Sequence, residues 1–358
     1  MVEKLLNFFY DAIKQTVDQS QKASFFKKCE ILKNERKIFM KMIGDHILIN
    51  SVEKGDSFSG IYYVQGIYEK KARTGKIYTD LQLSDRSGNQ FVRFWGKADD
   101  IKKNSWCVVH ARTDEYNGMM QIIIDQIESV EEPEDISAFV CVNENLQQDK
   151  ERFEKYISKV CDLCDEINDV TCINILGQIF TEEFKKLFFE AAYNDQPTYG
   201  KKGGVLSHTV KVVNAIGGFA QNYKFSVYET VISVTSALLH GCGAISAFDF
   251  KGAICEKSIV GNLHGLKNLT LNMISPIIEK IQNTKEFNKE TAMRIYHSLV
   301  TFDNNGTILP MTKEAILLAE VINMDLKLTS AVDFIESDTN SEDKFTAFDT
   351  ITKRHYYK

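Results

Sequence analysis

Residues 77–95 read IYTDLQLSDRSGNQFVRFW, two β-rich runs joined by the turn signal DRSG at residues 85–88. Side chains alternate between the two faces of a strand, so Leu81 and Leu83 share one face of the first run, and Val92 and Phe94 share one face of the second. We expect these four side chains in a core. The opposite face then carries Tyr78, Asp80, Gln82, Phe91, Arg93 and Trp95.

Three similar runs surround this pair, at residues 58–68, 106–112 and 119–127. Five short strands separated by turn signals predict a small β-barrel of the oligonucleotide-binding (OB) type. The wider gap at residues 96–104 is where such a barrel usually places a helix or a long connection. We assign residues 45–132 to this domain.

Helical periodicity dominates both ends of the chain. Apolar residues recur at helical spacing through residues 1–44, which predicts an N-terminal helical extension that packs on this chain or binds a partner protein. An acidic linker at residues 131–135 leads to a helical domain, residues 136–335, and a tail, residues 336–358. The predicted fold class is multidomain α+β. The candidate helices are 147–167, 181–192, 205–222, 228–240, 268–284, 290–302 and 312–328.

Composition limits the function. The chain has 358 residues, 44% hydrophobic and 26% charged, which is typical of a protein that folds in water. A net charge of −6 means that any nucleic-acid contact needs a local basic patch. The N-terminus lacks a secretory pattern, the eight cysteines are scattered, and the most apolar stretch, residues 230–248, is interrupted by polar residues. We expect a cytoplasmic protein without a membrane span, in which that stretch is a buried helix.

The outer face predicted for the barrel combines aromatic and basic residues. Phe91, Arg93 and Trp95 alternate along one strand, and Tyr78 lies on its neighbour. Aromatic rings stack on bases and cations contact phosphates, so this face predicts binding of single-stranded RNA or DNA. The alternative is that the rings pack under the N-terminal helices and the nearby cations form a solvated turn. The cations of the first hairpin are Lys70, Lys71, Arg73 and Lys76.

Two histidines of the helical half lie in motifs with a specific order. GGVLSHT at residues 203–209, ALLHGCG at 237–243 and ILPMTKEA at 308–315 resemble the HD phosphohydrolase domain of the YhaM family. These bacterial 3′-to-5′ exoribonucleases carry an OB domain followed by an HD domain. The resemblance covers the chain from about Val52 to its end. It implies an HD-type helical domain with His208 and His240 at metal-ligand positions.

The chain departs from the family's metal-binding pattern. Gly241 stands where the family has the aspartate of its His-Asp pair, and Thr198-Tyr199 stands where it has a histidine pair. Two divalent cations about 3.5–4 Å apart repel each other, and a carboxylate between them is what holds both. We therefore expect a lost or impaired hydrolytic centre, with His208 and His240 as vestiges.

Three functions follow from these patterns. The first is a single-stranded nucleic-acid-binding protein that needs no cofactor, in which Lys201 and Lys202, ahead of a helix N-terminus, attract phosphate. The second is an active metal-dependent 3′-to-5′ exonuclease with a rebuilt metal site that uses Mn or Mg. The third is a structural or regulatory subunit that forms a homo-oligomer or binds a protein partner through its N-terminal helices. The candidate metal ligands are His208, His240, His264 and Asp303.

Overall fold

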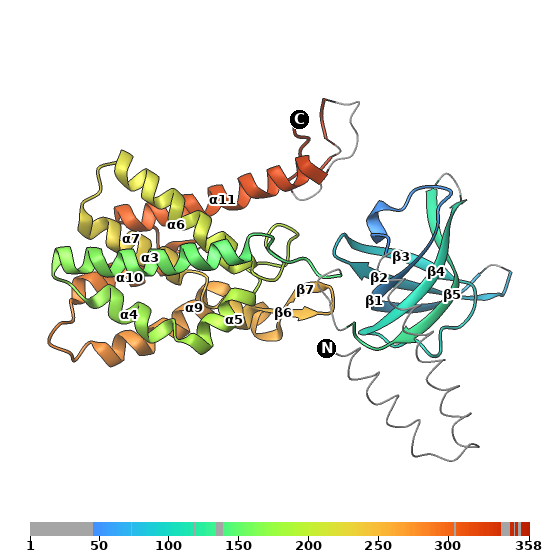
Figure 1. Cartoon of the computed structure of the whole chain (residues 1–358), viewed down its shortest axis with the longest axis horizontal. Helices are drawn as coiled ribbons and strands as arrows, with labels where there is room; N and C mark the ends of the chain where they lie inside the picture. The colour runs from blue at the N-terminus through green and yellow to red at the C-terminus, as the bar shows by residue number, and fades with distance from the viewer. Residues whose placement is uncertain are drawn as a thin grey trace, which may run out of the picture. The chain divides into compact units, whose positions relative to one another are not determined.

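The chain separates into two compact units, Met1–Glu134 and Asp135–Lys358, drawn in Figure 1. The structure, a computed structural model, describes residues 46–72, 74–116, 119–133, 139–303, 306–337, 344–346, 348–349 and 352–358. The predicted N-terminal helices at residues 1–44 and the hairpin residue Arg73 lie outside the described residues. Each unit is described by itself below.

The first unit contains a closed five-stranded barrel with the strand order β1-β2-β3-β5-β4. All neighbouring strands are antiparallel except β3 and β5, which pair in parallel. This arrangement confirms the predicted OB-type barrel, although the connection at residues 95–104 is a loop without a helix. The strands are β1 (Ser57–Lys71), β2 (Ile77–Asp85), β3 (Gly88–Phe94), β4 (Ser105–Tyr116) and β5 (Met119–Val130), preceded by the 3-10 helix η1 (Ile49–Ser51).

The barrel interior is filled by the residues that strand alternation selects. Leu81, Leu83 and Val92 are buried as predicted, and Phe94 is half-buried against the same cluster. Full burial of one such side chain contributes about 1.5–3 kcal/mol to stability. Because these side chains point inward, their neighbours in sequence on β2 and β3 must point out of the barrel.

The β2–β3 turn is fixed by Asp85. Its carboxylate accepts hydrogen bonds from the amides of Ile49 and Ser87, both at 2.7 Å. Burial raises the pKa of Asp85, but the imidazole of His46 and the bonds from Ser87 and Ile49 outweigh burial and hold the pKa below its ordinary value. The charged turn therefore ties η1 to the end of the hairpin and sets its register.

The second unit is a helical bundle with one small hairpin, shown in Figure 1. All seven predicted helices are present, but α4, α8 and the β6–β7 hairpin were not predicted from the sequence. Helix α9 begins nine residues earlier than expected, at Ile259 after the N-cap Ser258, and it is kinked at Gly265, which has a left-handed φ of 74°. The elements are α3 (Leu146–Ile167), α4 (Thr171–Ile179), α5 (Glu182–Glu190), α6 (Gly204–Asn222), α7 (Val227–Leu239), α8 (Ala244–Ala247), β6 (Phe248–Lys251), β7 (Ile254–Lys257), α9 (Ile259–Ile281), α10 (Lys289–Thr301) and α11 (Lys313–Ser337).

Helices α6 and α7 form the centre of the bundle. Ser226 begins α7 with a capping box, in which its hydroxyl accepts from the Glu229 amide and its own amide donates to the Glu229 carboxylate. The segment Val227–Ala247 is long and apolar enough to cross a membrane by length and composition, yet most of it is buried inside the unit. The predicted burial of this stretch is confirmed, but its helix ends at Leu239 and a turn separates it from the short helix α8.

Candidate functional site

The outward side of β1, β2 and β3 carries a set of side chains that we call the barrel face. Asp80 lies at its centre, because its Cα pairs with that of Tyr68 on β1 and that of Arg93 on β3. Trp95 follows the last residue of β3 and lies beside Tyr78. The barrel face comprises Tyr68, Lys70, Tyr78, Asp80, Gln82, Phe91, Arg93 and Trp95.

Four aromatic rings of the barrel face stand in two pairs. The centroids of Tyr68 and Phe91 are 5.9 Å apart, and those of Tyr78 and Trp95 are 5.5 Å apart. Tyr68, Phe91 and Trp95 are 45%, 59% and 44% exposed. Large exposed aromatic surface gathered in one place is typical of a binding site rather than of a solvated sheet.

Gly66 makes room for the first ring pair. A Cβ at this position would lie 2.8 Å from the ring of Tyr68, two residues along the same strand. The ring therefore lies over the glycine, on the side where it meets Phe91. Sequence reasoning missed Tyr68, although its position two residues before Lys70 on a strand already placed it on the same face.

A single carboxylate holds the two cations at the centre of the barrel face. Arg93 donates to Asp80 through Nε at 2.9 Å and Nη2 at 3.3 Å, and the Nζ of Lys70 donates to it at 3.0 Å. Burial raises the pKa of Asp80, but the hydrogen bonds from Arg93 and Lys70 outweigh burial and lower it. The guanidinium also lies 4.4 Å from the centroid of Tyr78. Arg93 is thus held in a fixed orientation, and the carboxylate of Asp80 balances part of its positive charge.

The rim of the barrel face lies at the first hairpin. The Nζ of Lys76 is 5.3 Å from the ring centroid of Trp95, and Lys71 is exposed at the end of β1. Beside Trp95 a hollow of about 460 Å³ continues toward β4 and β5, where Arg112 pairs with Asp125. This hollow was not predicted from the sequence. Its lining residues are Thr74, Lys76, Phe94, Trp95, Arg112, Ile123, Ile124 and Asp125.

In the helical unit, His208 is part of a buried network around Asp325. The Nδ1 of His208 donates to the Asp325 carboxylate at 2.6 Å, and the hydroxyl of Tyr199 donates to the same oxygen at 2.6 Å. Burial raises the pKa of Asp325, but the bonds from His208 and Tyr199 outweigh it and keep the pKa below its ordinary value. Because the hydroxyl of Thr329 also donates to it at 3.3 Å, this ionised carboxylate already has three donors.

The two histidines are neutral and partly unpaired. The Nδ1 of His240 donates to the Ala237 carbonyl at 2.6 Å, and its ring centroid is 5.1 Å from that of His208. Burial lowers the pKa of His208 and lowers that of His240 to about 3. Both Nε2 atoms are buried and have no hydrogen-bond partner. Two imidazole lone pairs inside the bundle are the groups that a metal ion would use.

Two neighbours close the space where a metal centre would lie. The ring of Tyr193 packs on His208 with a centroid distance of 3.9 Å and on His240 with a distance of 5.5 Å. A Cβ at Gly241 would lie 2.7 Å from Cγ2 of Val205, so an aspartate does not fit there without movement. No local pattern in the sequence pointed to Tyr193, because its partners come from α6 and the end of α7.

The other two candidate metal ligands line a hollow of about 550 Å³ that adjoins the histidine pair, because Tyr193 and Phe302, whose rings pack on His240, also line it. His264 is exposed on α9, and Asp303 forms a 2.8 Å ion pair with Lys267. Among the residues that the structure describes, no group of three histidine, cysteine or acidic side chains is arranged to hold a metal. The residues implied by the HD resemblance therefore do not fit a two-metal centre, and we derive no reaction through one.

The N-terminus of α6 is closed by protein groups. The amides of Gly204 and Val205 donate to the carbonyl oxygens of Lys201 at 2.9 Å and Ala191 at 3.1 Å. Lys202 forms a parallel bridge with Val142, and both lysines are half-buried. Because these first amides already have acceptors, the geometry does not support the phosphate site expected at this helix end.

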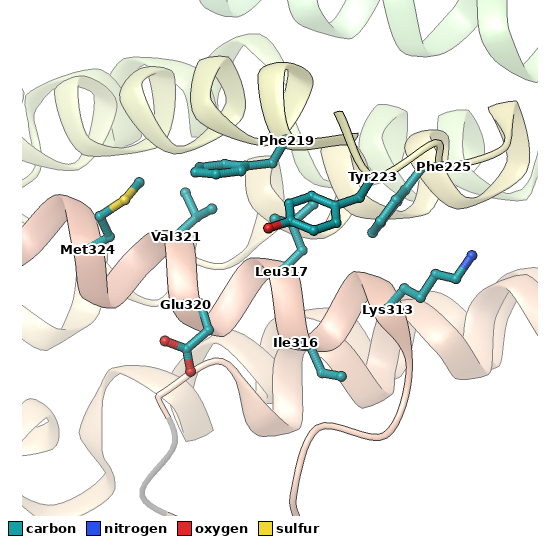
Figure 2. A pocket seen from close by; sticks show the side chains of 9 residues that line it. All are labelled: Phe219, Tyr223, Phe225, Lys313, Ile316, Leu317, Glu320, Val321 and Met324. Carbon is teal, nitrogen blue, oxygen red and sulfur yellow. The ribbon is translucent and has the colours of Figure 1, made fainter. Parts of the chain in front are cut away.

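An apolar pocket of about 430 Å³ lies between α6 and α11. Figure 2 shows Phe219, Tyr223 and Phe225 facing the apolar side chains of α11. Its polar groups are a tyrosine hydroxyl and the side chains of Lys313 and Glu320. Phe219 lies eleven residues after His208 on the same helix, about 16 Å along its axis. The pocket is therefore distinct from the histidine pair, and its lining offers apolar contact rather than catalytic chemistry.

Comparison with known proteins found partial similarity to solved structures of DNA-binding proteins, but no related family. No protein-family model matches the chain, and no curated protein matches it. The second OB-fold domain of replication protein A from Methanococcus maripaludis is 21% identical, with 25% of this chain and 99% of that chain covered and a TM-score of 0.22.

Two further structures show a similar extent of likeness. One is a replication protein A heterotrimer bound to single-stranded DNA, at 19% identity, 24% and 65% coverage, and a TM-score of 0.18. The other is a murine DNA binding protein bound with double-stranded DNA, at 14% identity, 24% and 49% coverage, and a TM-score of 0.21. We base the OB-type assignment on the strand order and register of the barrel itself.

Proposed function

We propose that this protein binds single-stranded nucleic acid on the barrel face. The observation that carries the proposal is the two aromatic pairs, Tyr68 with Phe91 and Tyr78 with Trp95, which come from β1, β2, β3 and the residue after β3. In OB-type barrels the surface of strands 2 and 3, between the first hairpin and the loop joining strands 4 and 5, holds oligonucleotides or oligosaccharides.

The chemistry of the barrel face favours an oligonucleotide with unpaired bases. Exposed rings offer faces to bases, each stacked base contributing about 1–3 kcal/mol, whereas a duplex hides those base faces. Cations at Lys71 and Lys76 supply phosphate contacts at the rim. The polar centre at Arg93 and Asp80 orients the rings around it.

The test is fluorescence anisotropy with a fluorescein-labelled 12-nucleotide oligouridylate and the matching oligothymidylate. We expect Trp95→Ala to weaken binding by about 5- to 150-fold, the loss of one stacked base, while Trp95→Phe retains most of the affinity. Binding must also weaken as salt rises, because phosphate contacts release counterions. Tyr223→Ala, an exposed aromatic substitution in the helical unit, is the matched control. An affinity that changes neither with salt concentration nor in Trp95→Ala would contradict the proposal.

We also propose that the helical unit is related to the HD domain of the YhaM exoribonucleases and has lost its hydrolytic centre. The support is chemical. Gly241 brings no carboxylate, Val205 fills the space beside it, and the Asp325 carboxylate is bound by His208 and Tyr199. Without a free carboxylate, these side chains provide no set of ligands that could hold two divalent cations against their mutual repulsion.

The rival function, a metal-dependent 3′-to-5′ exonuclease, is separated from this proposal by two measurements. We expect labelled single-stranded RNA incubated with the protein and Mn²⁺ to show no shortening that depends on His208 or His240. Elemental analysis of protein purified without chelator should find fewer than two Mn ions per chain. Shortening that disappears in His208→Ala and His240→Ala, or a full two-ion load, would establish the enzyme instead.

A further inference from the structure

The described tail residues form a short hairpin, which we call the tail hairpin. Phe345 pairs with Tyr357, and Asp349 pairs with Arg354, both in antiparallel bridges. The amide of Asp349 donates to the carbonyl of Arg354 at 2.9 Å. The backbone of this segment is therefore held by its own pairing. The tail hairpin comprises residues 344–346, 348–349 and 352–358.

One side of the tail hairpin is closed by polar bonds and by α11. Asp349 and Thr346 are buried, the Thr352 hydroxyl donates to the Asp349 carboxylate, and the Tyr356 hydroxyl donates to Thr352 at 2.8 Å. The ring of Tyr356 packs against Phe334 of α11 with a centroid distance of 6.0 Å. The one acidic side chain of the tail hairpin thus lies on the inside, and the hairpin is anchored on a helix.

The tail hairpin also exposes aromatic rings and cationic side chains. Phe345, Phe348 and Tyr357 are 56%, 49% and 65% exposed. The rings of Phe345 and Tyr357 meet edge to face at 5.4 Å, and those of Phe348 and His355 meet in the same way at 5.3 Å. An edge-to-face pair leaves the face of one ring open. The cationic residues of the tail hairpin are Lys344, Lys353, Arg354 and Lys358, and all are exposed.

We propose that the tail hairpin is a second contact surface for single-stranded nucleic acid. Exposed ring faces with cations around them provide the stacking and phosphate contacts that unpaired strands use. The same combination occurs on the barrel face, in the other unit of the chain. A lipid surface also attracts cations and aromatic residues, but three rings on a short, internally bonded hairpin offer little apolar area for insertion. The inference extends the proposed function but rests on different residues.

The experiment measures binding of the full chain to a fluorescein-labelled 40-nucleotide oligouridylate over a salt series. The tail-charge variant is Lys344→Gln/Lys353→Gln/Arg354→Gln, and the tail-ring variant is Phe345→Ala/Tyr357→Ala. The control, Lys159→Gln/Lys186→Gln/Lys285→Gln, removes three exposed lysines elsewhere in the helical unit. We expect the tail-charge variant to bind at least about 5-fold more weakly and to show a salt slope shallower by about 2, since each lost single-strand phosphate contact accounts for about 0.7.

A second measurement separates this inference from the proposed function. Ultraviolet crosslinking of the same oligouridylate, followed by mass spectrometry, should place a uridine on the peptide that contains Tyr357. The crosslink should persist in Phe91→Ala/Trp95→Ala, where the barrel face is disabled. If Phe91→Ala/Trp95→Ala binds the oligouridylate normally but the tail variants do not, the result contradicts the proposed function of the barrel face and supports the tail hairpin as a binding surface.

Two results would overturn the second surface. One is an unchanged affinity and salt slope in both tail variants, with no crosslink on the tail peptide. The other is loss of binding to phosphatidylserine vesicles in the tail variants without any loss of oligonucleotide binding, which would assign the tail hairpin to an anionic lipid surface. Because the tail-charge variant removes only exposed side chains, a melting temperature equal to that of the control shows that misfolding is not the cause.

Discussion

The ring of Tyr193 lies on the ring of His208, with their centroids 3.9 Å apart. Both groups are buried, and burial raises the pKa of Tyr193 while it lowers that of His208, so the two stay neutral together. A neutral phenol packed on a neutral imidazole is a stable interior arrangement. The Nδ1 atoms of the two histidines donate to Asp325 and to the Ala237 carbonyl, and their Nε2 atoms are buried without a hydrogen-bond partner.

This neutrality predicts that stability falls in mild acid. The pKa of His240 is about 3 in the folded chain and about 6.5 in the unfolded chain, so between these values the unfolded state binds a proton that the folded state does not. Unfolding therefore becomes easier as pH decreases through this window. For His240 alone we expect a loss of about 1 kcal/mol between pH 7 and pH 5.5, measured by urea denaturation.

The variant that isolates this effect is His240→Asn. Its amide nitrogen retains the donor to the Ala237 carbonyl and removes the titrating ring. Between pH 7 and pH 5.5 we expect the free energy of unfolding of His240→Asn to fall by about 1 kcal/mol less than that of the parent chain. In the exposed control His264→Asn the fall should equal that of the parent chain. Equal losses in all three proteins would show that His240 is not held neutral.

A second prediction concerns the missing aspartate. Gly241→Asp places a Cβ 2.7 Å from Val205 and a carboxylate among buried side chains, so we expect the free energy of unfolding to fall by at least about 2 kcal/mol. Gly241→Ala adds the same Cβ without a carboxylate, so it measures the destabilisation by the steric clash alone. Adding Val205→Ala should recover part of the loss, because the two sites share one space. A Gly241→Asp chain of unchanged stability that retains two Mn ions would contradict our interpretation of this site.

The parts of the fold that could be predicted are those fixed by local periodicity. Strand alternation alone placed Leu81 and Val92 inside the barrel and left Phe91 and Trp95 exposed, because a period of two is set by the backbone. Five of the seven predicted helices were found within two residues of their ends, but α9 begins nine residues earlier and α11 ends nine residues later than predicted. The short apolar run at Thr171–Ile179 was missed, since fewer than three turns carry little periodic signal.

The candidate sites were predicted less completely, because they depend on contacts between distant residues. The sequence placed Asp80 and Arg93 on the outer face of the barrel, but it did not show that Asp80 would bind both Arg93 and Lys70. Tyr193 precedes His208 by 15 residues in an irregular segment, where no period applies. Its position over the histidine pair is a product of tertiary packing.

The shared carboxylate at the centre of the barrel face yields a third prediction. Asp80→Asn removes the negative charge that Arg93 and Lys70 now contact, while its amide oxygen still accepts a hydrogen bond from the guanidinium. We expect tighter binding of a 12-nucleotide oligouridylate at low salt and a salt slope steeper by about 0.7, one more phosphate contact. Isothermal titration over a salt series measures both.

The control for this change is Asp125→Asn, which removes a charge from the pair with Arg112 in the neighbouring hollow. If both substitutions steepen the salt slope equally, the effect reflects overall charge rather than the centre of the barrel face. A weaker affinity in Asp80→Asn at every salt concentration would instead mean that Asp80 serves mainly to orient Arg93 over Tyr78.

The fourth prediction tests whether the first aromatic pair acts as a unit. In Gly66→Ala the new methyl group occupies the space now filled by the Tyr68 ring, 2.8 Å away, and the flexible ring must move from its place beside Phe91. The barrel should remain folded, because its interior is untouched and only an exposed side chain is displaced. We expect oligouridylate affinity to fall by about 3- to 10-fold, within the range of one partly lost stack.

A double-mutant cycle identifies the cause. If Gly66→Ala acts by moving Tyr68, it should have no further effect on affinity in the Tyr68→Ala background, and the coupling free energy should be about 1 kcal/mol. Additive losses would mean that the glycine matters for the strand itself, next to the irregular pairing between Val64 and Gly66. Urea denaturation of the four proteins distinguishes these outcomes, since damage to the strand lowers stability and a displaced exposed ring does not.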